Sequence, residues 1–316
     1  MAPGAVVVGS SVGHRILALT LVLVAACGSL TTQAPPSPTP PPSPLRNGVA
    51  RLASSLAFDP FVPDDFGAGF DISASLVARP VPRDRPSAPL GEPLLLVRLT
   101  LAGGGKTALT MLQGPEDCCA EMVRLTTPVD LTIRASQTGG APEIRGQLGS
   151  PANRNTDGST LAWLQPAASG RRTYVALLAT AFGTQFERDG LLRIARSMRV
   201  VDRGTAAVPI LLYWSTFTSH DPSGYRLFAG ARSAPLPEEA RLIDGAGQII
   251  NIAPFEPPKA YDCLHAAAGV AAFAVPRDVV EAFNPQRGDS GYRVEARVAG
   301  GWMPVELVAS GCFATE

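Results

Sequence analysis

Alternating apolar positions predict the first clear β-strand of the chain. Phe70, Ile72, Ala74, Leu76 and Ala78 occupy every second position and are separated by small or polar residues. Because successive side chains of a strand point to opposite faces, this spacing gives one half-buried face. Further apolar runs bounded by turn residues predict strands over 94–101, 107–112, 125–133, 161–163 and 174–179.

A glycine run, Gly103 to Gly105, separates two of these runs and is followed by Lys106 and Thr107. The letters GGGKT invite comparison with a phosphate-binding loop. That motif needs a further glycine at position 100, where this chain has Thr, and a helix after the threonine. The following residues read as a returning strand, so we predict a hairpin turn here.

Two stretches predict amphipathic helices. The first is 46–56, where Val49, Leu52 and Leu56 share a face. The second follows Thr184 and Glu187, whose spacing is that of a capping box, and carries its apolar residues on one face. We expect this helix to pack on the preceding sheet.

Beyond residue 209 the pattern consists of short apolar runs, after a break at 201–209 that predicts a domain boundary. Their spacing suits a small β-sandwich, with Asp244-Gly245 and Gly300-Gly301 as hairpin turns. The runs cover 210–217, 225–229, 240–243, 249–253, 270–275, 292–298 and 302–308. The expected fold class is therefore α+β: a curved antiparallel sheet with packed helices, followed by a small disulfide-bridged β-sandwich.

The order Leu161-Ala-Trp163, a turn at Gly170, Tyr174-Val-Ala-Leu177 and then the capped helix resembles one known group of domains. These are extracytoplasmic sensor-type domains found behind anti-sigma-factor anchors and in some lipoproteins. The resemblance covers about 160–200 and implies a curved antiparallel sheet that cradles helices. It implies a sensor or binding role and transfers no catalytic residue.

The N-terminus has the order of a signal peptide. His14 and Arg15 precede an apolar run from Ile16 to Ala26 that is too short to span a membrane, which takes about 20 residues. The residues Val24-Ala-Ala-Cys27 resemble the lipobox of bacterial lipoproteins, which implies a lipid-modified Cys27 at the mature N-terminus. An ordinary secretory signal and a membrane helix with a chance cysteine are the alternatives.

Residues 31–45 contain seven prolines in fifteen positions, a composition typical of a semi-rigid polyproline II spacer. The predicted organisation is a signal peptide over 1–27, a proline-rich linker over 28–45, an α+β domain over 46–202 and a β-sandwich domain over 203–316. The expected location is extracytoplasmic, on the cell membrane or the outer membrane, held by the N-terminal lipid.

Four cysteines remain after Cys27, and an even number in an exported chain indicates disulfides. Cys263 and Cys312 both lie in the predicted sandwich, so we expect a bridge between them. Cys118 and Cys119 are adjacent, and neighbouring Cα atoms lie about 3.8 Å apart, below the usual disulfide span of about 4.4–6.8 Å. Two buried thiols and a bridge that clamps a turn both remain open.

The 27 Lys and Arg balance 27 Asp and Glu, and no basic run is interleaved with aromatics, so we expect no nucleic-acid partner. Gly288-Asp-Ser-Gly291 matches a serine-protease loop in four letters, but His265 lies too close in sequence to fit that family. A surface turn explains these four letters. Arg287-Gly-Asp289 spells an integrin-type adhesion tripeptide, which chance explains in a chain rich in glycine and arginine. His220 and His265 have no neighbour at metal-ligand spacing beyond Asp262-Cys263-x-His265, and Cys263 is expected in the disulfide, so we expect no metal and no cofactor.

These observations favour a membrane-anchored binding, sensor or scaffold protein of the cell envelope, without catalytic residues. Its expected partners are the membrane and either an envelope protein or an apolar ligand. The alternative is a cell-envelope hydrolase whose site forms only in the fold.

Overall fold

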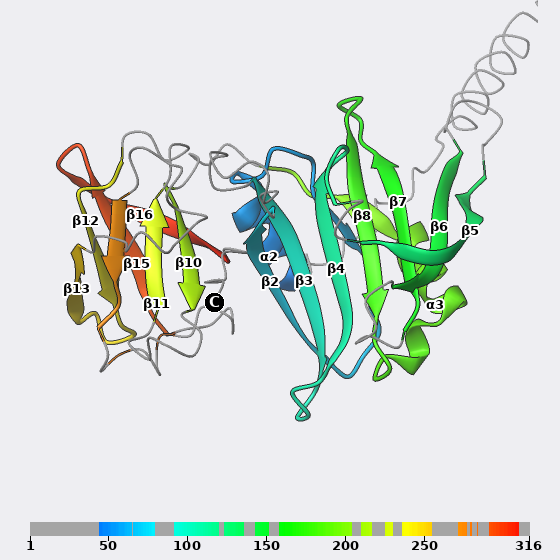
Figure 1. Ribbon diagram of the computed structural model, residues 1–316, viewed down its shortest axis with the longest axis horizontal. Helices are drawn as coiled ribbons and strands as arrows, with labels where there is room; N and C mark the ends of the chain where they lie inside the picture. The colour runs from blue at the N-terminus through cyan, green and yellow to red at the C-terminus, as the bar shows by residue number, and fades with distance from the viewer. Residues whose placement is uncertain are drawn as a thin grey trace, which may run out of the picture. The chain divides into compact units, whose positions relative to one another are not determined.

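The computed structural model describes residues 44–64, 66–79, 92–119, 123–135, 143–151, 158–203, 210–216, 225–229, 236–254, 271–276, 279, 283 and 291–309. Strands predominate among them, and fourteen strands hydrogen-bond into one sheet (Figure 1). Within these ranges no helix combines the length and apolar character needed to cross a membrane.

Seven antiparallel strands form the half of the sheet that carries the candidate site. In spatial order they are β2 (Phe70–Ala78), β3 (Pro93–Leu101), β4 (Thr107–Pro115), β8 (Arg172–Ala179), β7 (Thr160–Pro166), β6 (Ile144–Pro151) and β5 (Leu125–Arg134). Short turns join β3 to β4 and β7 to β8, but β4 is followed in the chain by β5, at the far edge of the sheet. The chain therefore passes β8, β7 and β6 between Pro115 and Leu125.

One face of these strands carries the larger apolar core and two helices, α2 (Pro44–Ala53) and α3 (Arg188–Arg196). The apolar stripe of α3, formed by Leu191, Leu192, Ile194 and Ala195, is buried in this core. At the end of α3 the guanidinium of Arg196 donates to the carbonyl of Ile133 at 2.9 Å. The helix is thereby fastened to the edge strand β5.

A short strand, β1 (Phe61–Pro63), pairs with β9 (Met198–Val200) outside the large sheet. The side chain of Gln113 in β4 is fully buried and binds both backbone polar groups of Phe61. This amide contact links the two-stranded pair to the large sheet.

The remaining strands of the sheet are β10 (Ile210–Thr216), β11 (Tyr225–Ala229), β12 (Glu239–Ile243), β13 (Ile249–Pro254), β14 (Ala271–Ala274), β15 (Arg293–Val298) and β16 (Gly301–Ala309). Because β10 pairs with β11 and also, in parallel, with β16, these seven strands close into a ring. The end of β16 also pairs in parallel with β2, where Val308 faces Leu76.

The predicted α+β fold class, a curved antiparallel sheet with packed helices followed by a small β-sandwich, is wrong, whereas the bridge predicted for that sandwich lies outside the described residues. The described chain is mostly β, with two α-helices and one large sheet. The edge strand β2 pairs with β16, so a single hydrogen-bonded sheet contains strands from both 46–202 and 203–316. The assignment of 46–202 and 203–316 as domains stays a prediction.

Most predicted elements are present. The glycine run forms the turn between β3 and β4, with φ of +72° at Gly103 and +63° at Gly105, a backbone region that favours glycine. The predicted second helix starts later than the capping-box spacing indicates. Thr184–Phe186 form a 3₁₀ turn, and Glu187 is the N-cap of α3 without a side-chain cap bond.

Candidate binding pocket

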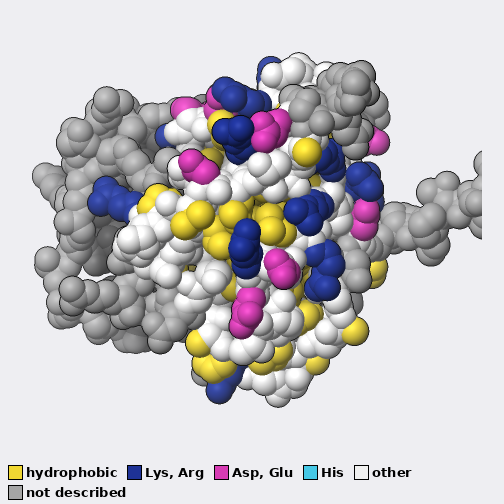
Figure 2. Space-filling view, turned by 90° about the vertical axis from the view of Figure 1, so that its right-hand side faces the viewer, with side chains coloured by type: hydrophobic (Ala, Val, Ile, Leu, Met, Phe, Trp, Pro, Cys, Tyr) yellow, Lys and Arg dark blue, Asp and Glu magenta, His cyan; other side chains and the backbone are white. Residues whose placement is uncertain are grey.

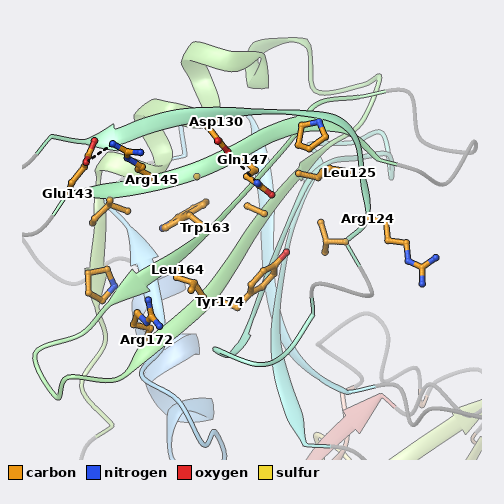
Figure 3. A pocket seen from close by; sticks show the side chains of 16 residues that line it. Arg124, Leu125, Asp130, Glu143, Arg145, Gln147, Trp163, Leu164, Arg172 and Tyr174 are labelled. Atoms are coloured by element: carbon orange, nitrogen blue, oxygen red, sulfur yellow. Dashed lines mark hydrogen bonds and ion pairs between the residues drawn. The ribbon is translucent and has the colours of Figure 1, made fainter. Parts of the chain in front are cut away.

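A pocket of about 990 Å³ opens on the face of β5, β6, β7 and β8 (Figure 3). Strand alternation determines which side chains reach it. Leu161 and Trp163 of β7 belong mainly to the core under α3, whereas Ala162 and Leu164 belong to a smaller apolar cluster on the opposite face. The pocket is therefore on the face that α3 does not cover.

The hollow has two visible causes in the strands. Ala162 of β7 lines the pocket and stands opposite Ala176 of β8, so a small side chain lies at this point of its lining. Strand β5 carries two register shifts relative to β6, and such bulges bend a strand and increase its twist. Figure 3 shows β5 and β6 curving over the pocket.

A third contribution comes from Gly149 in β6, which lies against the first of these shifts. A Cβ on Gly149 would stand 2.9 Å from the carbonyl oxygen of Thr126. The glycine therefore lets β5 approach closely where it bends.

The apolar side of the pocket is formed by Val123, Leu125, Leu164 and the ring of Tyr174. Tyr174 is only 9% exposed, and burial raises the pKa of its hydroxyl to about 12. Figure 3 shows the hydroxyl pointing into the pocket, and it has no hydrogen-bond partner within the described ranges. It therefore stays protonated at physiological pH and is available to donate and accept.

The opposite side of the pocket, along β5 and β6, carries two polar pairs. The Gln147 amide donates to the Asp130 carboxylate at 3.3 Å, and Arg145 lies 3.1 Å from Glu143 (Figure 3). Hydrogen bonding from Arg145 lowers the pKa of the exposed Glu143 carboxyl. The pocket thus has an apolar side and a polar side.

Two further arginines lie at its rim. Arg172 is paired with Glu116, whereas Arg124 is exposed and has no ion-pair partner in the part of the chain that the structure describes. Figure 2 shows the side of the molecule at the right of Figure 1, and there acidic and basic side chains are intermingled around a hydrophobic area. Neither sign of charge dominates that view.

The segment between β4 and β5 supports one wall of the pocket through a disulfide between Cys118 and Cys119. Both cysteines are buried, at 0% and 4% exposure, in the cluster that also contains Val123 and Tyr174. The Val123 amide donates to the Cys119 carbonyl at 2.9 Å, so the bridge and the pocket wall are directly connected.

Ion pairs hold the start of this segment on the sheet. Besides the Glu116–Arg172 pair, Arg79, the residue directly after β2, has its guanidinium 3.3 Å from the Asp117 carboxylate and donates to the Asp117 carbonyl at 2.9 Å. The residues directly before the Cys118–Cys119 bridge are thus ion-paired to the sheet on both sides.

The sequence prediction for the other cysteines and for the histidines is not tested by the geometry. Cys27, Cys263, Cys312, His220, His265 and Ser290 all lie outside the described residues. Within the described ranges no group of three His, Cys, Asp or Glu side chains is placed to hold a metal ion.

The pocket residues were not singled out by sequence reasoning. The available signal was strand alternation: with Leu161 and Trp163 assigned to the core, Ala162 and Leu164 had to face the other way. What alternation does not indicate is that this second face is hollowed and that Gln147 and Asp130 of neighbouring strands meet on it. Those features depend on strand order and on the shifts in β5.

Comparisons with known proteins give no family assignment. No protein-family model matches the chain, and neither a search of curated proteins nor one of solved structures finds a match.

Proposed function

We propose that the chain is a lipid-anchored extracytoplasmic binding protein of the cell envelope, and that its ligand occupies the pocket on β5–β8. The anchor and the location derive from the lipobox-like residues that end in Cys27 and from the proline-rich spacer after them. Two acyl chains on one N-terminal residue give stable membrane attachment, whereas a single chain is marginal. The spacer then keeps the folded part away from the membrane surface.

The pocket is the single observation that carries the binding role. Its volume of about 990 Å³ lies at the upper end of the range, about 300–1,000 Å³, that is typical of ligand sites. Its apolar side offers Leu125, Leu164 and the Tyr174 ring to a ligand. An apolar surface of this kind gains free energy when a ligand excludes water from it.

A probe-binding experiment on the purified full chain tests the binding role. N-phenyl-1-naphthylamine, an uncharged dye that fluoresces in apolar surroundings, should bind with a stoichiometry of one. Leu164→Glu places a charge against the apolar side and should abolish dye binding, since an unpaired charge is expensive there.

Ile249→Glu is the matched control, because Ile249 is 52% exposed on β13 and does not line the pocket. It should bind the dye as the native chain does. Failure of the native chain to bind the dye, or equal binding by Leu164→Glu, would show that the pocket is not a ligand site.

The anchor needs its own test. Cys27→Ser should move the protein from the membrane fraction to the soluble extracytoplasmic fraction, because serine cannot carry a thioether-linked lipid. Cys118→Ser is a useful control, since Cys118 forms the buried bridge and should not affect fractionation. Sedimentation of the Cys27→Ser protein with membranes would exclude the lipid anchor.

A further inference from the structure

The polar side of the pocket indicates which class of amphiphile it takes. We infer that the ligand is a neutral amphiphile with several hydroxyls on its head group, and that this head lies beside Asp130, Gln147 and Arg145. Its apolar chain then lies against Val123, Leu125 and Leu164. The inference rests on the proposed function, since it specifies the ligand of the same pocket.

Charge balance is the first argument. Three arginines border the pocket, Arg124, Arg145 and Arg172, and they are matched by Asp130, by Glu143 and by Glu116, the partner of Arg172. A ligand with a net charge of either sign would therefore meet groups of its own sign. A head group without net charge avoids this repulsion.

The state of the arginines is the second argument. Arg145 and Arg172 already hold carboxylates, so an anionic head would have to displace Glu143 or Glu116 to reach a guanidinium. The remaining one, Arg124, extends away from the floor of the pocket in Figure 3. Two of the three cations thus neutralise carboxylates of the protein itself, and the third does not point at the floor of the pocket.

The hydrogen-bonding groups are the third argument. Carboxylates accept, the guanidinium donates, and the amide of Gln147 does both, so the polar side presents both kinds of group within a short stretch of β5 and β6. A hydroxyl group is also both a donor and an acceptor, and several hydroxyls on one head can match such a mixed set.

Tyr174 supplies an independent observation that points to a ligand. It is nine-tenths buried, and its hydroxyl faces the pocket with no partner in the described part of the chain (Figure 3). The hydroxyl borders the open pocket, so a ligand hydroxyl that displaces water there can hydrogen-bond to it. Burial also keeps this phenol neutral, since it raises the pKa to about 12.

The test compares four probes with the same twelve-carbon chain, each used below its micellar concentration with the full chain carrying Cys27→Ser. Dodecyl maltoside has a neutral polyhydroxylated head, dodecylphosphocholine a zwitterionic head, laurate an anionic head and dodecyltrimethylammonium a cationic head. Isothermal titration should give the maltoside an affinity at least about tenfold above that of each other probe, as one or two additional hydrogen bonds would produce.

Variants locate the selectivity. Gln147→Leu and Tyr174→Phe should each weaken maltoside binding by about tenfold and leave laurate binding unchanged, because they remove head-group contacts only. Gln185→Leu and Tyr292→Phe are the matched controls and should not change the affinity for any probe. Neither control residue lines the pocket.

The possible outcomes separate the two proposals. Equal or tighter binding of laurate or of dodecyltrimethylammonium would overturn the head-group inference and leave the binding function standing. Binding of all four probes with equal affinity would likewise overturn the head-group inference and leave the binding function standing. If none of the four probes binds, the proposed function itself fails. Selectivity for the maltoside that disappears in Gln147→Leu supports both.

Discussion

Gly114 of β4 packs directly against the sulfur atom of Cys118. A Cβ on Gly114 would stand 2.6 Å from the Cys118 Sγ and 2.9 Å from the Cys119 Sγ. Both distances are shorter than non-bonded heavy atoms tolerate, so only glycine lets the disulfide rest on the strand. Since Val123 hydrogen-bonds to Cys119, the missing side chain at Gly114 also determines where one pocket wall lies.

Gly114→Ala should therefore destabilise the protein. The added methyl group overpacks a buried site, and overpacking typically costs about 1–3 kcal/mol. Urea unfolding followed by tryptophan fluorescence measures the change. Gly48→Ala is the control: Gly48 lies within α2 with no atom within 4 Å of the added Cβ. That variant should gain about 0.5–1 kcal/mol, because alanine favours helix. Equal stabilities of the two variants would contradict the packing described here.

Removing the bridge tests its packing role separately. Cys118→Ala combined with Cys119→Ala deletes two buried sulfur atoms and should reduce stability by about 1–3 kcal/mol through the cavity that remains. Loop-closure entropy contributes little, because the bridge joins adjacent residues and closes no long loop.

The same double variant should bind N-phenyl-1-naphthylamine more weakly, because it removes the two sulfur atoms from the apolar cluster that contains Val123 and leaves only the backbone hydrogen bond to residue 119. Urea unfolding and dye titration are the two measurements. An unchanged unfolding midpoint together with unchanged dye affinity would mean that the bridge supports neither the core nor the pocket wall.

Strand positions were well predicted from the sequence because their signal is local. The alternation from Phe70 to Ala78 matches β2 at both ends, and all seven short runs beyond residue 209 fall on β10–β16. Each of these predictions depends only on side-chain periodicity within one segment.

The joining of the sheet was not predicted, because it depends on residues far apart in the chain. No pattern within β16 indicates that Val308 pairs with Leu76 of β2, so two separate folds were expected where one sheet exists. The pocket was missed for a related reason. Asp130 and Gln147 meet only because β5 pairs with β6 in a shifted register. The adjacent cysteines Cys118 and Cys119 were noted in the sequence. Whether they form a disulfide could not be predicted, because the bridge packs against Gly114 of β4.

Gln113 makes the contact that holds β1, and its substitution should be severe. Its amide nitrogen donates to the Phe61 carbonyl at 2.6 Å, and its oxygen accepts from the Phe61 amide at 2.8 Å. Gln113→Leu leaves both buried backbone groups without this partner, and an unsatisfied buried group costs roughly 1–3 kcal/mol.

Hydrogen exchange of the Phe61 amide measures this effect locally, and urea unfolding measures it globally. The exposed Gln185 of the 3₁₀ turn provides the control, and Gln185→Leu should leave both readings unchanged. Native-like protection of the Phe61 amide in Gln113→Leu would show that the paired strand β9 alone holds β1.

Glu306 of β16 should make stability depend on pH. Burial raises the pKa of its carboxyl, and the positive charge of Arg51, 4.0 Å away, offsets part of this effect. The folded-state pKa then lies above the unfolded value, so between the two the folded chain binds more protons than the unfolded chain. Stability therefore falls as pH rises through this interval, which begins near the unfolded pKa of about 4.3.

Glu306→Gln removes the titrating group and should make the protein more stable than the native chain at pH 7. The gain should shrink as pH falls and disappear below the unfolded pKa, where the native carboxyl is protonated in both states. Urea unfolding from pH 3.5 to pH 7.5 follows it. Arg51→Gln is the opposite control: it removes the offsetting charge and should steepen the native decline. A gain in Glu306→Gln that is the same at every pH would mean that packing, rather than the proton, is responsible.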